Sequence, residues 1–152
     1  MESRFTRSFR AAFFTCSLAI ASIAIAGTGD EMSLRDHLQI GSRITRGAKS
    51  DTLEVKFIIS PEVRLYAAPK TIFQSLSVTP TGVTSSQPTL FRMADGSRHD
   101  VHAGTLTMTA FFPKSALSCG AVVRAVVQTQ GCTVSLCFPP ENIPIVASTE
   151  SC

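Results

Sequence analysis

The sequence predicts an all-β domain, an immunoglobulin-like antiparallel β-sandwich. About seven short segments are rich in β-branched and aromatic residues, and the clearest of them alternates apolar with polar positions. Proline and glycine separate these segments at spacings near a dozen residues, and no segment has the sustained 3.6-residue apolar stripe of a helix. Such spacing is typical of immunoglobulin-like sandwiches. The chain contains no tryptophan, so the Cys-Trp-Cys core of antibody domains is not expected.

The first and clearest predicted strand is "LEVKFIIS", residues 53–60. Leu53, Val55, Phe57 and Ile59 alternate with more polar neighbours, which is the period of a half-buried strand, and a proline ends the segment. The same reasoning places the later strands at 63–67, 73–79, 89–93, 104–112, 121–130 and 142–148.

Residues 1–26 have the pattern of a secretory signal peptide. Arg4, Arg7 and Arg10 precede an apolar run of 16 residues, which ends at the small-x-small sequence of residues 24–26. Polar residues interrupt this run, and it is short for a membrane-spanning helix. The sequence therefore predicts export, with an uncleaved membrane anchor as the alternative.

Removal of residues 1–26 leaves 11 basic and 10 acidic side chains. This near balance gives no basic field for nucleic acid, so no nucleic-acid partner is expected. Residues 27–50 are polar and glycine-containing, and we expect a loosely ordered N-terminal arm that contributes one edge strand. Residues 51–152 are expected to form the β-sandwich domain.

Four cysteines remain after the signal: Cys119, Cys132, Cys137 and Cys152. In an oxidising compartment an even set predicts disulfides, with three pairings open. If a hairpin turns around residues 133–136, opposed residues have numbers that sum to about 269, so Cys119 faces residue 150. The hairpin therefore favours Cys132–Cys137 together with Cys119–Cys152.

The two predicted bonds differ in how much they stabilise the fold. The chain-entropy estimate is about 3.8 kcal/mol for the loop closed by Cys119–Cys152 and about 2.2 kcal/mol for the loop closed by Cys132–Cys137. The long bond is thus the structural one. Spacing alone leaves the short pair open between a redox pair and a second structural disulfide, while a zinc ribbon would need two tight cysteine pairs.

The segment "QGCTVSLCFPPENIPI", residues 130–145, resembles the active-site hairpin of the N-terminal periplasmic (alpha) domain of the thiol:disulfide interchange protein DsbD. The residues that match are Gln130, Gly131, Cys132, Cys137, Phe138, Pro139, Pro140 and Glu141. A weaker similarity covers residues 52–147 and includes the Leu-Tyr pair of "LEVKFIISPEVRLYA".

This resemblance implies an immunoglobulin-like thiol:disulfide oxidoreductase in the periplasm that needs no cofactor. Its dithiol would pass reducing equivalents between a membrane-embedded donor and thioredoxin-like periplasmic proteins, including those of cytochrome c maturation. By the same resemblance, Cys137 would form the mixed disulfide and Cys132 would resolve it. Since the sequence ends at Cys152, the donor is expected to be a separate protein.

Two features depart from the family. Four residues separate the cysteines where the family usually has five, and the tip lacks the acidic residue often found there. The family also covers its disulfide with a loop bearing an aromatic residue before a glycine; here that stretch is "LFRMADG", residues 90–96, with Met93 or Ala94 at the aromatic position. Phe91 and Met93 are the candidate cap residues, since methionine packs well on irregular surfaces.

Phe138 and Pro139 are candidate partner contacts. Proline lacks an N–H group, so Pro139-Pro140 should interrupt strand pairing directly after Cys137.

Two other functions compete with thiol exchange. One is a non-catalytic immunoglobulin-like binding or assembly module with two structural disulfides. The other is copper handling by Met93, His99 and His102, since thioether and imidazole suit that metal, although "RHDVH" is expected to be a solvated loop. No metal site is predicted.

Overall fold

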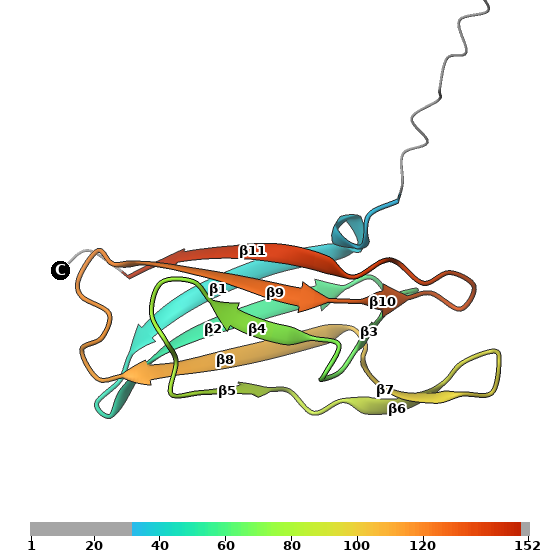
Figure 1. The fold of residues 1–152 in the computed structure, drawn as a ribbon, viewed down its shortest axis with the longest axis horizontal. Helices are drawn as coiled ribbons and strands as arrows, with labels where there is room; N and C mark the ends of the chain where they lie inside the picture. The colour runs from blue at the N-terminus through green and yellow to red at the C-terminus, as the bar shows by residue number, and fades with distance from the viewer. Residues whose placement is uncertain (1–31, 150–152) are drawn as a thin grey trace, which may run out of the picture. The chain divides into compact units, whose positions relative to one another are not determined.

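The computed structural model describes residues 32–149 and confirms the predicted antiparallel β-sandwich. Within this range the chain forms eleven strands in three antiparallel sheets and one short 3₁₀ turn, η1 (Leu34–His37). Figure 1 shows the strands in two layers, with several short strands gathered at one end.

The first sheet has the order β1 (Leu38–Arg46), β2 (Ser50–Ile59), β8 (Thr105–Pro113) and β5 (Gly82–Ser85). Every second residue of β2 is buried, as the alternation predicted, and β8 alternates in the same way. This face supplies one half of the core.

The second sheet has the order β11 (Glu141–Ser148), β9 (Val122–Thr129) and β4 (Ile72–Ser75). It packs against the first sheet, since inward residues of β9 and β11 join those of β2 and β8 in one apolar cluster. The largest fully buried side chains of this cluster include Phe57, Phe112, Phe138, Leu34 and Leu53.

The third sheet has the order β10 (Gly131–Cys132), β3 (Arg64–Tyr66), β7 (Arg98–His102) and β6 (Thr89–Arg92). It lies at the right-hand end of Figure 1, where β9 leads into β10. A second, smaller cluster is built here from Tyr66, Val101 and Cys132. The cysteine pair is thus placed at one end of the sandwich.

The described part of the N-terminal arm, residues 32–50, contains regular structure. The anticipated edge strand is β1, and it pairs with β2 along all nine of its residues. Before it, η1 inserts Leu34 into the main core with no exposed surface. The single apolar side chain that anchors this turn was not distinguishable in a polar, glycine-containing segment.

Two strands, β5 and β7, were not predicted. The prediction of a solvated loop over "RHDVH" is wrong, because these residues form β7 between β3 and β6. Their charges hid the strand, since only Val101 and His102 are buried. All four residues of β5 are exposed, so β5 carries no apolar alternation.

The predicted signal or anchor, residues 1–26, lies outside the described residues, as does Cys152. In residues 32–149 there is no helix with the length and apolar character needed to span a membrane.

Candidate redox site

The disulfide hairpin, residues 129–141, changes register before its tip. Glu141 pairs with Thr129 where β11 meets β9, whereas nearer the tip the Phe138 amide donates to the Gly131 carbonyl at 2.9 Å. Gln130 therefore lies opposite two prolines, which form a bulge. The predicted interruption by Pro139-Pro140 is present, and it lets β10 leave the second sheet and pair with β3.

Cys132 and Cys137 form a disulfide with an S–S distance of 2.05 Å and a Cα–Cα distance of 4.0 Å. The two residues also make an isolated antiparallel bridge, so the strands hold them directly opposite each other. The predicted Cys132–Cys137 bond is therefore present.

Thr133 organises the four-residue tip between the cysteines. Its hydroxyl oxygen accepts from the amides of Ser135 at 3.3 Å and Leu136 at 3.0 Å. Its own amide donates to the Leu136 carbonyl at 2.7 Å. Short polar side chains commonly fix turns in this way, so the tip is closed by its own hydrogen bonds, while Val134 and Leu136 are 71% and 52% exposed.

The two cysteines differ sharply in burial. Cys132 is 2% exposed and belongs to the small cluster with Tyr66 and Val101, whereas Cys137 is exposed. An incoming thiol therefore has readier access to Cys137.

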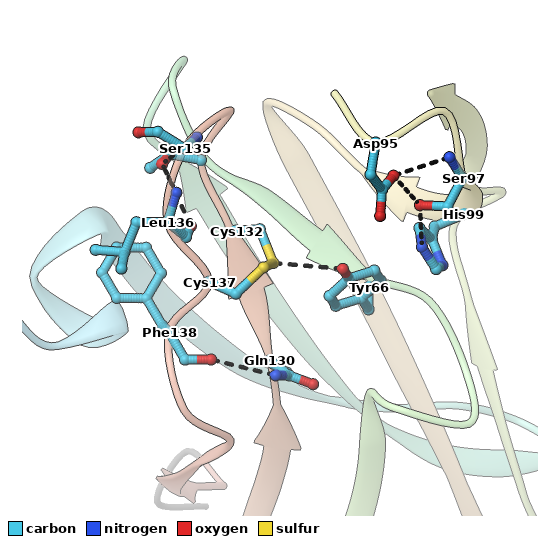
Figure 2. The surroundings of a disulfide bond; sticks show 11 residues. Tyr66, Asp95, Ser97, His99, Gln130, Cys132, Ser135, Leu136, Cys137 and Phe138 are labelled. Atoms are coloured by element: carbon cyan, nitrogen blue, oxygen red, sulfur yellow. Dashed lines mark hydrogen bonds between the residues drawn. A yellow bond between two sulfur atoms is a disulfide. The ribbon is translucent and has the colours of Figure 1, made fainter. Parts of the chain in front are cut away.

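Tyr66 contacts the buried side of the bond. Its hydroxyl oxygen lies 3.4 Å from Cys132 Sγ, and its ring is met by the edge-on ring of His99 at a centroid distance of 5.1 Å. Figure 2 shows Tyr66 pointing at the sulfur from β3, with His99 behind it. Sequence reasoning noted Tyr66 only as half of a Leu-Tyr pair. The contact joins residues 66 positions apart, so no local pattern reveals it.

The covering hairpin, residues 89–102, contains both candidate cap residues. Phe91 and Met93 are partly buried and pack against the cluster that contains Cys132. The Arg64 guanidinium lies over the Phe91 ring at 5.5 Å. The structure thus places both side chains beside the predicted redox pair.

Asp95 closes the turn of the covering hairpin. Its carboxylate accepts from the Ser97 hydroxyl at 2.6 Å and the Ser97 amide at 2.8 Å. These hydrogen bonds lower the pKa of the exposed Asp95 carboxyl. Gly96 has a φ of 86°, which favours glycine. The Ser97 hydroxyl lies 3.1 Å from His99 Nε2, which links the turn to the ring beside Tyr66.

Phe138 does not face outward as the predicted partner contact would require. It is 2% exposed and lies in the main core, where its ring packs against His37 at a centroid distance of 5.2 Å. The reason is the bulge at Pro139-Pro140, which directly follows Phe138 and shifts the alternation so that Phe138 faces inward. Pro139, in contrast, is exposed.

The N-terminal turn braces the base of the disulfide hairpin. Glu141 accepts from the Ser33 hydroxyl at 2.9 Å and from the Leu34 amide at 2.6 Å. At Gly131, an added Cβ would lie 2.8 Å from Leu34 Cδ1 and 3.1 Å from the Arg64 carbonyl oxygen. The glycine thus permits the close approach of three segments.

The two histidines of the copper hypothesis do not converge. His99 and His102 are three positions apart on β7, so their side chains point to opposite faces. His102 is 4% exposed, and burial lowers its pKa. In residues 32–149, no group of three or more His, Cys, Asp and Glu side chains is arranged to hold a metal ion.

Cys119 lies beyond the other end of β9. Its Sγ accepts from the Arg46 guanidinium at 3.2 Å. The β9–β11 register continues to the Thr149 amide, which donates to the Ala121 carbonyl at 2.9 Å. Because Cys152 lies outside the described residues, the Cys119–Cys152 bond stays a prediction.

The chain is an immunoglobulin-like sandwich with a disulfide in a hairpin at one end. No protein-family model and no curated relative matches it. Among solved structures, its fold is that of DsbD N-terminal domains, as the resemblance predicted. The reduced N-terminal domain of DsbD from Neisseria meningitidis matches with a TM-score of 0.57 and 17% identity, over 80% of this chain and 93% of that chain.

Two further structures share this fold. The N-terminal periplasmic domain of ScsB from Proteus mirabilis has a TM-score of 0.57 and 10% identity, over 73% of this chain and 46% of that chain. The complex between the DsbD and PilB N-terminal domains of Neisseria meningitidis has a TM-score of 0.51 and 17% identity, over 70% of this chain and 80% of that chain.

Proposed function

We propose that this protein is a periplasmic thiol–disulfide carrier that works through Cys132 and Cys137. It passes reducing equivalents between a membrane-embedded donor and thioredoxin-like proteins. The observation that carries the proposal is a disulfide with one buried and one exposed cysteine, at the end of a sandwich whose fold is that of DsbD N-terminal domains.

The asymmetry between the cysteines fits a division of roles. Disulfide exchange needs an accessible sulfur that a thiolate can attack and a second thiol that later releases the product. Exposed Cys137 suits the first role, and buried Cys132 suits the second. The DsbD N-terminal domain of Neisseria meningitidis has been solved in complex with the PilB N-terminal domain, so a domain of this fold can engage a protein partner.

A pair of matched variants tests the proposal. Cys132→Ala leaves Cys137 free, and Cys137→Ala leaves Cys132 free, while both keep Cys119 and Cys152. Each variant is incubated with a purified thioredoxin-like protein that lacks its own resolving cysteine and carries 5-thio-2-nitrobenzoate in a mixed disulfide on its remaining cysteine. Attack by the free thiol of the variant then releases 5-thio-2-nitrobenzoate as the leaving thiolate. We expect a mixed disulfide with Cys132→Ala and several-fold less with Cys137→Ala, as measured by non-reducing electrophoresis and mass spectrometry.

Failure of both variants to trap the partner would contradict the carrier function. The hairpin bond would then be structural, as in the non-catalytic binding module.

A further inference from the structure

Tyr66 makes a polar contact with the buried sulfur of the disulfide. Its hydroxyl oxygen lies 3.4 Å from Cys132 Sγ, and Tyr66 itself is 8% exposed. A disulfide sulfur carries no hydrogen, so the phenol O–H group must be the donor. Figure 2 shows this contact on the side of the bond that faces β3.

Opening the bond places negative charge on this same sulfur. In the proposed exchange, a partner thiolate attacks Cys137 Sγ and forms a new S–S bond with it. The Cys132–Cys137 bond breaks, and its electron pair stays on Cys132 Sγ, which leaves as a thiolate. Cys132 is packed against Val101, with Phe91 and Met93 beside the cluster, and an apolar environment disfavours the charged form. A nearby hydrogen-bond donor is therefore needed.

We propose that Tyr66, with Lys70 over its ring, is the donor that stabilises the Cys132 thiolate. This inference rests on the proposed function, because it assigns a catalytic role within that exchange. The Lys70 ammonium lies 3.9 Å from the centroid of the Tyr66 ring, well within cation–π distance. A cation in this position withdraws electron density from the ring and strengthens the phenol as a donor. It also adds positive charge near the developing thiolate.

The backbone holds Tyr66 in place for this role. The Tyr66 amide donates to the Gln130 carbonyl at 2.9 Å, two residues before Cys132. The Thr71 hydroxyl donates to the Tyr66 carbonyl and lies 2.8 Å from the Thr129 hydroxyl. The phenol and the sulfur are therefore positioned by the same stretch of chain, so the donor is in place before the bond opens.

Other charged groups also lie around Tyr66. Arg64 pairs with Cys132 in the β3–β10 register, but its guanidinium donates to the carbonyls of Pro61 and Val63 at 2.5 and 2.9 Å. Asp95 is engaged by Ser97 in the turn. On β7, His99 meets the ring edge-on, and Arg98 and Asp100 line the cleft beside Tyr66 with Lys70. Lys70 is the cation placed over the phenol ring itself.

The test compares Tyr66→Phe, Lys70→Gln and the control Lys56→Gln. Tyr66→Phe keeps the ring and removes the hydroxyl, while Lys56 is an exposed cation on β2, in another sheet. In the reduced proteins, the Cys132 thiol is titrated by its ¹³Cβ chemical shift. In the oxidised proteins, the rate of bond opening is measured with excess glutathione as the probe.

We expect Tyr66→Phe to raise the titration midpoint of Cys132 by about one pH unit and to slow opening roughly tenfold or more, because hydrogen bonds to charged groups are strong. Lys70→Gln should have a smaller effect in the same direction, roughly two- to fivefold. Lys56→Gln should leave both quantities unchanged. Unfolding is measured alongside, because a purely structural role would change stability without moving the Cys132 titration.

The proposal would be overturned if Tyr66→Phe left both the acid dissociation constant of the Cys132 thiol and the rate of bond opening within twofold of their wild-type values. That result is distinguishable from failure of the proposed function. Loss of partner trapping by Cys132→Ala, with the tyrosine effect intact, would instead refute the carrier role and leave the Tyr66 contact standing.

Discussion

The two hairpins that meet at the disulfide are held in different ways. The disulfide hairpin is anchored in the main core by Phe138 and braced by the bonds from Glu141 to the N-terminal turn. The covering hairpin contributes only Val101 to a buried cluster, with Phe91 and Met93 partly buried beside it. Regions with little buried apolar area open at low free energy. We infer that the sulfurs are fixed while their cover opens more easily.

The largest expected effect is at the anchor of the disulfide hairpin. Phe138→Ala should lower the free energy of unfolding by about 3–5 kcal/mol, since it removes a fully buried aromatic side chain. Leu136→Ala, at the 52% exposed tip, is the control and should change stability by less than about 0.5 kcal/mol. Urea unfolding measures both. Equal effects would show that Phe138 is not the anchor.

The second largest expected effect on stability is at Gly131, where three segments approach closely. Gly131→Ala should cost about 1–3 kcal/mol, because the new Cβ meets both a leucine side chain and a backbone carbonyl. Gly41→Ala is the matched control, since an added Cβ there has nothing within 4 Å, and it should be neutral or slightly stabilising. If Gly131→Ala proves as harmless in urea unfolding as its control, the packing of η1 against β10 is looser than the structure shows.

A substitution in the covering hairpin should change the free energy of unfolding only a little and should change the access of reductants to the disulfide more. Phe91→Ala should cost only about 1 kcal/mol because the ring is partly buried, and it should speed reduction of Cys132–Cys137 by glutathione several-fold. Leu90→Ala, on the same strand and 65% exposed, serves as the control. Unchanged reduction kinetics in Phe91→Ala would mean that the covering hairpin does not shield the sulfurs.

The smallest expected effect is on the pH dependence of the free energy of unfolding. Burial lowers the pKa of His102 from the ordinary value of 6.5, so the unfolded chain binds more protons than the folded chain below about pH 6.5. Stability should therefore fall as the pH drops from about 6.5 to the folded pKa, by at most about 1.4 kcal/mol per pH unit for this group. His102→Gln should remove this part of the slope. Identical slopes for the two proteins, from unfolding at several pH values, would exclude His102 as its source.

Local sequence patterns predicted the parts of the fold that depend on alternation and on proline. The buried face of β2 follows from the spacing of Leu53, Val55, Phe57 and Ile59, and these four residues are 0–3% exposed. The interruption at Pro139-Pro140 follows from the missing N–H groups. Cys132–Cys137 followed from the assumed hairpin, although the β9–β11 register sums to 270 and returns to 269 only across the bulge.

Contacts between distant residues could not be predicted in this way. The turn η1 buries Leu34, the bulge that follows Phe138 turns this side chain inward, and Tyr66 contacts Cys132 from the neighbouring strand. Each depends on how sheets meet at the end of the sandwich. The charged strand β7 escaped prediction because its burial comes from its neighbours β3 and β6 rather than from apolar alternation.

The central claim is that Cys132–Cys137 is a working redox pair, and its reduction potential tests this most directly. The oxidised protein is equilibrated with a graded series of glutathione and dithiothreitol buffers, and trapped thiols at Cys132 and Cys137 are quantified by mass spectrometry. We predict a potential above about −300 mV, outside the range of structural disulfides in secreted proteins. A bond that stays oxidised well below about −300 mV would contradict the account.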